Sequence, residues 1–76
     1  MKTVKVQPAP GGWTVECDLG DMPLAFLSAE AAFLKAEELG GLYADRGQLA
    51  RVLVEDRYGT VTSSIVIGPG LPRRSR

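Results

Sequence analysis

Alternation of apolar and polar residues in short runs, strict in two of them, constrains the fold of this 76-residue chain more than any other feature. Successive side chains of a strand point to opposite faces, so a run with a period of two predicts a strand with one buried face. Thr3–Gln7 and Trp13–Asp18 alternate in this way, and Pro8–Gly12 between them is rich in proline and glycine. This arrangement predicts a β-hairpin near the N-terminus.

A second pair of runs, Leu49–Glu55 and Thr60–Ile67, flanks the turn residues Asp56–Gly59, and one face of each run is mostly apolar. Gly59 can supply the positive φ that a type I turn followed by a bulge requires. These runs predict a second hairpin. In the last strand, four side chains are expected to face inward: Val61, Ser63, Ile65 and Ile67.

The segment between the hairpins has helical periodicity. Ser28 is a suitable N-cap, and Glu30 would place its charge at the positive end of the helix. Apolar residues then recur at helical spacing over residues 29–39. Because two interior glycines cost about 2 kcal/mol relative to alanine, we expect the helix to stop or break at Gly40-Gly41. The alternative is a longer helix that ends at Gly47, which suits a left-handed C-cap.

The order of these elements predicts an α+β fold of the type ββ(β)αββ. Leu24–Leu27 is either a brief third strand or the entry to the helix. One amphipathic helix would pack on a four- or five-stranded antiparallel sheet built from two hairpins. We expect a single domain over residues 1–68. Residues 69–76 would form a flexible tail rich in proline, glycine and arginine, because Gly68–Pro72 cannot continue a helix or strand.

The residue inventory argues against an enzyme. Nine basic side chains balance nine acidic ones, and the chain has one cysteine and no histidine. Cys17 lies on the predicted inward face, cannot form an internal disulfide and has no histidine to activate it, so we interpret it as a small buried hydrophobe. One cysteine without histidine does not build a zinc site, no acidic run has calcium-loop spacing, and the glycines match no phosphate loop. We expect no catalytic residue, no metal site and no cofactor.

The aromatic residues are expected to have structural roles. Trp13, Phe26 and Phe33 fall on inward positions and would fill the core. Tyr43 and Tyr58 fall in or near connections, where we expect them at the surface. The longest uncharged stretch, Tyr58–Pro72, is shorter than the roughly 20 residues of a membrane span. We therefore expect a cytoplasmic protein without a membrane partner.

The outer face of the predicted sheet is polar apart from Leu53 and Val66. Adjacent hairpin strands would bring these two side chains together, with Arg51 and Glu55 on either side of Leu53. An isolated surface leucine needs no function. A domain this small buries its own apolar surface incompletely, however, and an apolar spot on an open sheet suits a two-fold contact. We therefore predict an interaction module that forms a homodimer, or binds an unknown protein partner, through this face. The predicted outer face comprises Thr3, Lys5, Gln7, Thr14, Glu16, Asp18, Arg51, Leu53, Glu55, Thr62, Ser64 and Val66.

Binding of nucleic acid is the alternative function. A sheet that binds RNA presents aromatic side chains and a basic surround. The predicted outer face has no aromatic residue and carries two basic against three acidic groups, so nucleic acid is an unlikely partner for it. Only the C-terminal residues Arg73, Arg74 and Arg76 favour this alternative, as an electrostatic tail.

Several local patterns resemble a known type of domain. Gly12-Trp13-x-Val15 opens the second strand, Phe26–Ser28 leads into an alanine-rich helix, and residues 52–61 read Val-Leu-Val-Glu-Asp-Arg-Tyr-Gly-Thr-Val. Over residues 3–67 the chain is similar to small bacterial domains of unknown function with a ββαββ layout. Gly40–Gln48 and the short Leu24–Leu27 segment depart from that pattern. The resemblance implies a fold and transfers no catalytic or binding residue.

Overall fold

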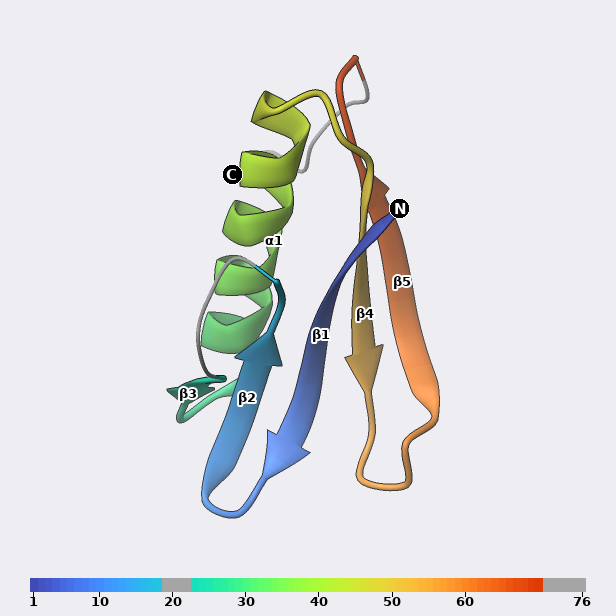
Figure 1. Ribbon diagram of the computed structural model, residues 1–76. Coiled ribbons are helices and arrows are strands. Elements are labelled where there is room, and N and C mark those ends of the chain that lie inside the picture. The colour runs from blue at the N-terminus through green and yellow to red at the C-terminus, as the bar shows by residue number, and fades with distance from the viewer. Residues whose placement is uncertain (19–22, 71–76) are drawn as a thin grey trace.

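A computed structural model describes residues 1–18 and 23–70 of the chain. It contains one helix and five strands in the order β1 (Lys2–Ala9), β2 (Gly12–Glu16), β3 (Leu24–Phe26), α1 (Ala29–Asp45), β4 (Ala50–Glu55) and β5 (Val61–Ile67). Helix α1 packs on one face of a single five-stranded sheet (Figure 1). The predicted α+β architecture, with one helix on a sheet of two hairpins, is therefore confirmed.

The strands lie in the order β3-β2-β1-β4-β5. The β1–β2, β2–β3 and β4–β5 pairs are antiparallel, so most of the sheet is antiparallel as expected. The central pair, β1–β4, is parallel. Helix α1 returns the chain to the end of the sheet where β1 begins, and the Lys2 amide donates to the Leu49 carbonyl at 2.9 Å. The two hairpins are thus joined side by side by a crossover connection.

The short segment before the helix is a strand. Leu24–Phe26 pairs with β2 and forms β3, which settles the choice between strand and helix entry. Ser28 then caps α1 as predicted, because its hydroxyl accepts a hydrogen bond from the Ala31 amide at 3.1 Å. Leu27 precedes this cap and is 92% exposed.

The expectation that α1 stops at Gly40-Gly41 is wrong, because the helix continues to Asp45. Both glycines are buried where the helix crosses the sheet. A Cβ at Gly40 would come within 2.9 Å of Ile67 Cδ1, so a larger residue would require the Ile67 side chain or the helix to shift. Gly47, with φ of 78°, instead ends the helix. The Gly47 amide donates to the Ala44 carbonyl at 2.9 Å and the Gln48 amide to Tyr43 at 3.0 Å, which is a Schellman motif.

The core lies between α1 and the covered face of the sheet. Valines from the central strands meet a helix face made mostly of alanine and glycine, which allows the two layers to approach closely. The expectation that Tyr43 lies at the surface is wrong: the ring is 2% exposed, because the extra helical turns beyond Gly41 carry it back onto the sheet. Tyr58 is exposed as expected. The buried apolar residues are Val4, Val6, Val15, Ala32, Ala36, Leu39, Tyr43, Ala44, Ala50, Val52 and Ile67.

The second hairpin contains an irregularity that changes one face assignment. Its turn forms as predicted, with Gly59 at φ 80° and the Asp56 amide donating to the Thr60 carbonyl at 2.9 Å. Ser63 lies opposite Val54, but Val61 lies opposite Glu55, so Thr62 is an extra residue in β5. Because directly opposed residues share a face, this bulge places Val61 on the open face with Glu55. The expected inward position of Val61 is therefore wrong, and its side chain is 46% exposed.

Candidate interaction surface

The face of the sheet opposite α1 is the surface on which the predicted interface residues lie. We call it the open face, because no element within residues 1–18 and 23–70 covers it (Figure 1). The strand register places Arg51 opposite Val66 and Leu53 opposite Ser64. Lys5 stands between Leu53 of β4 and Glu16 of β2. The structure therefore brings Arg51, Leu53, Glu55 and Val66 onto one continuous surface.

Leu53 occupies the middle of an apolar strip on this face. Its side chain is half-buried, and Val66 lies diagonally across the β4–β5 pair with 40% of its side chain exposed. The bulge at Thr62 places Val61 diagonally on the other side of Leu53. We call Val61, Leu53 and Val66 the apolar strip. Sequence alternation missed Val61, because a bulge shifts the alternation by one residue and leaves no mark in the apolar pattern.

Charges of both signs surround the apolar strip. The Nζ atom of Lys5 lies 4.0 Å from Oε2 of Glu55, and the Glu55 side chain is 17% exposed against 39% for Lys5. A pair at this distance and exposure contributes little stability. With Arg51 and Glu16 added, the strands of the open face carry two basic and two acidic groups. The strands of this surface are therefore electrically balanced.

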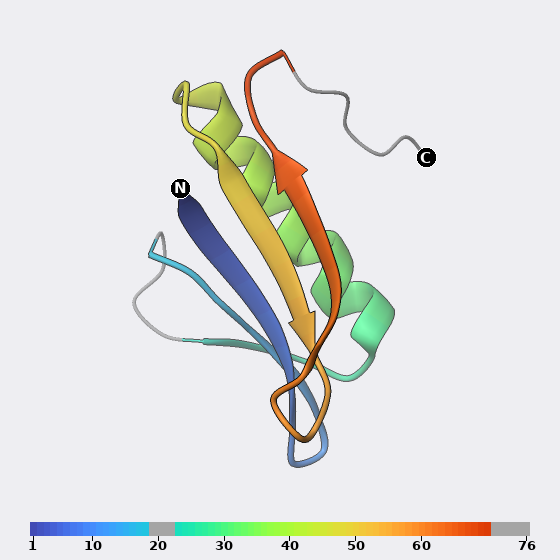
Figure 2. The ribbon, with the colours of Figure 1, turned by 90° about the vertical axis from the view of Figure 1, so that its right-hand side faces the viewer.

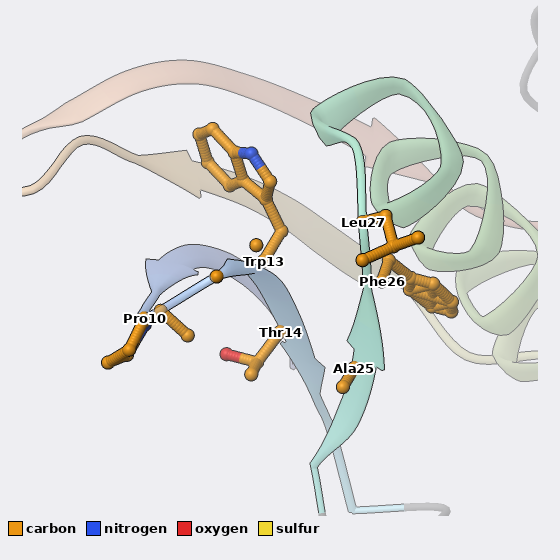
Figure 3. Close-up of a pocket in the computed structure, with 9 residues that line it drawn as sticks. Pro10, Trp13, Thr14, Ala25, Phe26 and Leu27 are labelled. Carbon is orange, nitrogen blue, oxygen red and sulfur yellow. The ribbon is translucent and has the colours of Figure 1, made fainter.

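A small hollow lies beside Trp13, at the edge of the sheet formed by β2 and β3 (Figure 3). Trp13 rises from β2, and Leu27 borders the hollow at the entry to α1, while Phe26 points toward the helix. The hollow measures about 170 Å³, below the roughly 300 Å³ at which small-molecule sites begin. Trp13 packs against the core but is only half-buried, so its predicted role as a core residue holds for part of the ring. The hollow is lined by Ala9, Pro10, Gly11, Gly12, Trp13, Thr14, Ala25, Phe26 and Leu27.

Tyr43 is the titratable group that its surroundings perturb most clearly. Burial raises the pKa of the Tyr43 hydroxyl above its ordinary value of 10.0, and the neighbouring Cys17 raises this pKa further. The backbone of Asp18 lowers the pKa of Tyr43. No described group meets full hydrogen-bonding geometry with the Tyr43 hydroxyl oxygen. Cys17 packs half-buried against the core, in line with its interpretation as a small hydrophobe.

Other kinds of site find no support in the described part of the chain. Residues 1–18 and 23–70 contain no group of three histidine, cysteine, aspartate or glutamate side chains placed to hold a metal ion. Among the described segments, no helix has both the length and the apolar character needed to span a bilayer. The predicted electrostatic tail, Arg73, Arg74 and Arg76, lies outside the described residues.

No protein-family model, curated protein or solved structure matches the chain. The resemblance to small bacterial ββαββ domains therefore stays a prediction.

Proposed function

We propose that this protein is a non-enzymatic interaction module that associates with a second copy of itself through the open face of its sheet. The observation that carries the proposal is the apolar strip, in which Leu53 is flanked by Val61 and Val66 on a face that no described element covers. Apolar side chains grouped on an open sheet are removed from water when a second sheet packs against them.

The charge pattern supports a second copy as the partner. Two-fold symmetry places a residue on the axis against its own copy and a residue away from the axis against a different residue of the other protomer. A face with both signs of charge can therefore pair basic with acidic groups on either side of the axis. Arg51 and Glu55 lie on either side of Leu53, along the same strand face. Antiparallel stacking of two such faces would set Arg51 of one copy near Glu55 of the other and fix the orientation of the dimer.

The expected affinity is modest. Val61 and Val66 are 46% and 40% exposed, and Leu53 is half-buried, so much of their apolar area is already covered in the monomer. Burial of the remainder would contribute on the order of 2–4 kcal/mol per protomer before the entropic cost of association is subtracted. The contact therefore needs high protein concentration, and a face-to-face dimer should dissociate readily on dilution.

Leu53→Glu tests the proposal. Glutamate on the open face is harmless to an isolated sheet, but in the dimer it would place two negative charges in the centre of the contact. We expect sedimentation equilibrium to show a lower average mass for Leu53→Glu than for the wild type at the same concentration. Ala29→Glu, which adds the same charge at an exposed position of α1 on the opposite side of the sheet, is the control and should behave as the wild type. Equal masses for the wild type and Leu53→Glu would contradict the proposal.

A further inference from the structure

We infer that the free edge of β5 is a second interaction surface, which pairs with the β5 edge of another copy so that two sheets join into one. Strand β5 is the last strand of the described sheet and has β4 on one side only. Figure 2 views the molecule from this side, and β5 lies in front of the other strands. This contact uses the edge of the sheet and is independent of the open face.

The backbone determines what kind of partner fits this edge. Alternate residues of an edge strand direct their N–H and C=O groups away from the sheet, and these groups require donors and acceptors at the spacing of another strand. Apart from its bulge, β5 is regular over Ser63–Ile67, long enough for a five-residue ladder. The structure therefore offers a template for an added strand.

The side chains of β5 lack the features that usually block such pairing. Soluble proteins protect sheet edges with lysine or other charges, proline, bulges or very short strands. Between Thr60 and Gly70 the chain has no charged residue, and β5 has no proline. Five of its seven residues are β-branched, the residue type that favours strands. The one protective feature is the bulge at Thr62, at the beginning of the strand.

The opposite edge of the sheet shows the contrast. Strand β3 has three residues, and Pro23 directly precedes it. A strand this short, next to a residue without an amide hydrogen, supports at most one or two added hydrogen bonds. Of the two edges, only β5 is suited to strand addition.

A second copy of this chain is the occupant that the charges favour. Antiparallel pairing about a two-fold axis places β5 against β5, and each strand presents to the other the same row of donors and acceptors. An uncharged strand brings no like charges together in this arrangement. The open face, by contrast, carries charged side chains, namely Lys5, Arg51, Glu16 and Glu55. Of these two surfaces, the β5 edge is the one that can contact its own copy without bringing charged side chains together.

Ser63→Lys tests the edge without altering the open face. Ser63 is exposed and lies opposite Val54, on the side of the sheet away from Leu53. In the Leu53→Glu background, which removes the face contact, we expect sedimentation equilibrium to show a dimer at high concentration. Adding Ser63→Lys should convert it to a monomer of 8.1 kDa. Ala31→Lys adds the same charge on the exposed surface of α1 and should leave the dimer intact. A monomeric Leu53→Glu protein at that concentration would overturn the inference.

Hydrogen exchange in the same proteins identifies the strand that pairs. Backbone amides of Ser63–Ile67 that do not donate to β4 should exchange rapidly in dilute Leu53→Glu protein and at least tenfold more slowly at high concentration. The slowing should disappear in Leu53→Glu/Ser63→Lys, whether or not that variant is marginally less stable. Protection of these amides in the dilute monomer would show that the chain covers its own edge and would also overturn the inference. The proposed open-face contact can fail independently, since its failure leaves Leu53→Glu indistinguishable from the wild type.

Discussion

Gly40 of α1 lies directly against Ile67 of β5, so closely that a Cβ on Gly40 would stand 2.9 Å from Ile67 Cδ1 and 3.5 Å from Val52 Cγ2. Ile67 is 4% exposed and Val52 is fully buried, so both side chains belong to the core between helix and sheet. The missing side chain at position 40 therefore leaves room for the side chains of the two strands that follow the helix. This contact explains why a glycine pair that weakens an isolated helix is compatible with a continuous helix here.

Gly40→Ala should lower the free energy of unfolding by about 1 kcal/mol, although the same change in a solvent-exposed helix raises it by a similar amount. The physical reason is the clash with Ile67 Cδ1, which exceeds the gain in helix propensity. In an Ile67→Val background, which lacks that atom, Gly40→Ala should be neutral or stabilising. Denaturant titrations of the four proteins measure the coupling, which we expect to be at least 0.5 kcal/mol. Gly40→Ala proteins that are more stable in both backgrounds would contradict the contact.

Local patterns predicted most of the fold because they act over a few residues. Alternation placed β1, β2, β4 and β5, and Ser28 and Gly47 have the chemistry of helix ends, which the structure uses. The favoured helix end at Gly40-Gly41 was wrong because propensity measures an isolated helix. The contact with Ile67 comes from a residue 27 positions later and leaves no local signal. Burial of Tyr43 follows from the same extension of α1.

The residues of the candidate surface were also predictable wherever the strands are regular. Leu53, Val66, Arg51 and Glu55 share the open face because their strands alternate regularly from Ala50 to Val54 and from Ser63 to Ile67. Val61 was assigned to the wrong face because one extra residue reverses every assignment beyond it. The free edge of β5 could not be identified from alternation, since strand order depends on how the helix crosses the sheet.

Trp13→Ala should lower the free energy of unfolding by about 2–3 kcal/mol. Truncation of a fully buried tryptophan costs about 3–5 kcal/mol, and Trp13 is only half-buried against the core. Leu27 borders the same hollow but is 92% exposed, so Leu27→Ala should change stability by less than about 0.5 kcal/mol. Urea unfolding followed by circular dichroism compares the two variants. Equal midpoints for Trp13→Ala and the wild type would place the indole outside the core.

The folded domain should not bind nucleic acid at physiological salt, because its open face is electrically balanced and carries no aromatic residue in β1, β4 or β5. Binding through the C-terminal Arg73, Arg74 and Arg76 alone would weaken with salt with a log–log slope of about −2 to −3. Fluorescence anisotropy with a single-stranded oligonucleotide at several salt concentrations measures this slope. Deletion of residues 73–76 should remove whatever binding occurs at low salt. Binding that survives the deletion would transfer the site to the domain and contradict the charge argument.

Alkaline pH should destabilise the protein through Tyr43. Burial raises the pKa of Tyr43 in the folded state, so above the ordinary value of 10.0 the unfolded chain releases this proton while the folded chain retains it. The stability contributed by the neutral hydroxyl is therefore fully present below pH 10.0 and is lost as the pH rises toward the folded-state pKa. Tyr43→Phe should flatten this part of the pH profile. It should cost little at neutral pH, because no described group makes a full hydrogen bond to the hydroxyl.

Tyr58→Phe provides the matched control for that experiment. Tyr58 is 83% exposed, so this substitution should leave the alkaline loss of stability unchanged. Melting temperatures measured between pH 8 and the onset of alkaline unfolding compare the three proteins, and the titration of lysine and arginine is common to all of them. If the wild type and Tyr43→Phe lose stability in parallel as the pH rises, ionisation of the buried Tyr43 hydroxyl does not cause the alkaline loss of stability. We expect the melting temperature to fall more steeply with pH in the wild type and Tyr58→Phe than in Tyr43→Phe. That result would assign the alkaline loss of stability to Tyr43, the tyrosine that the extended helix carries into the core.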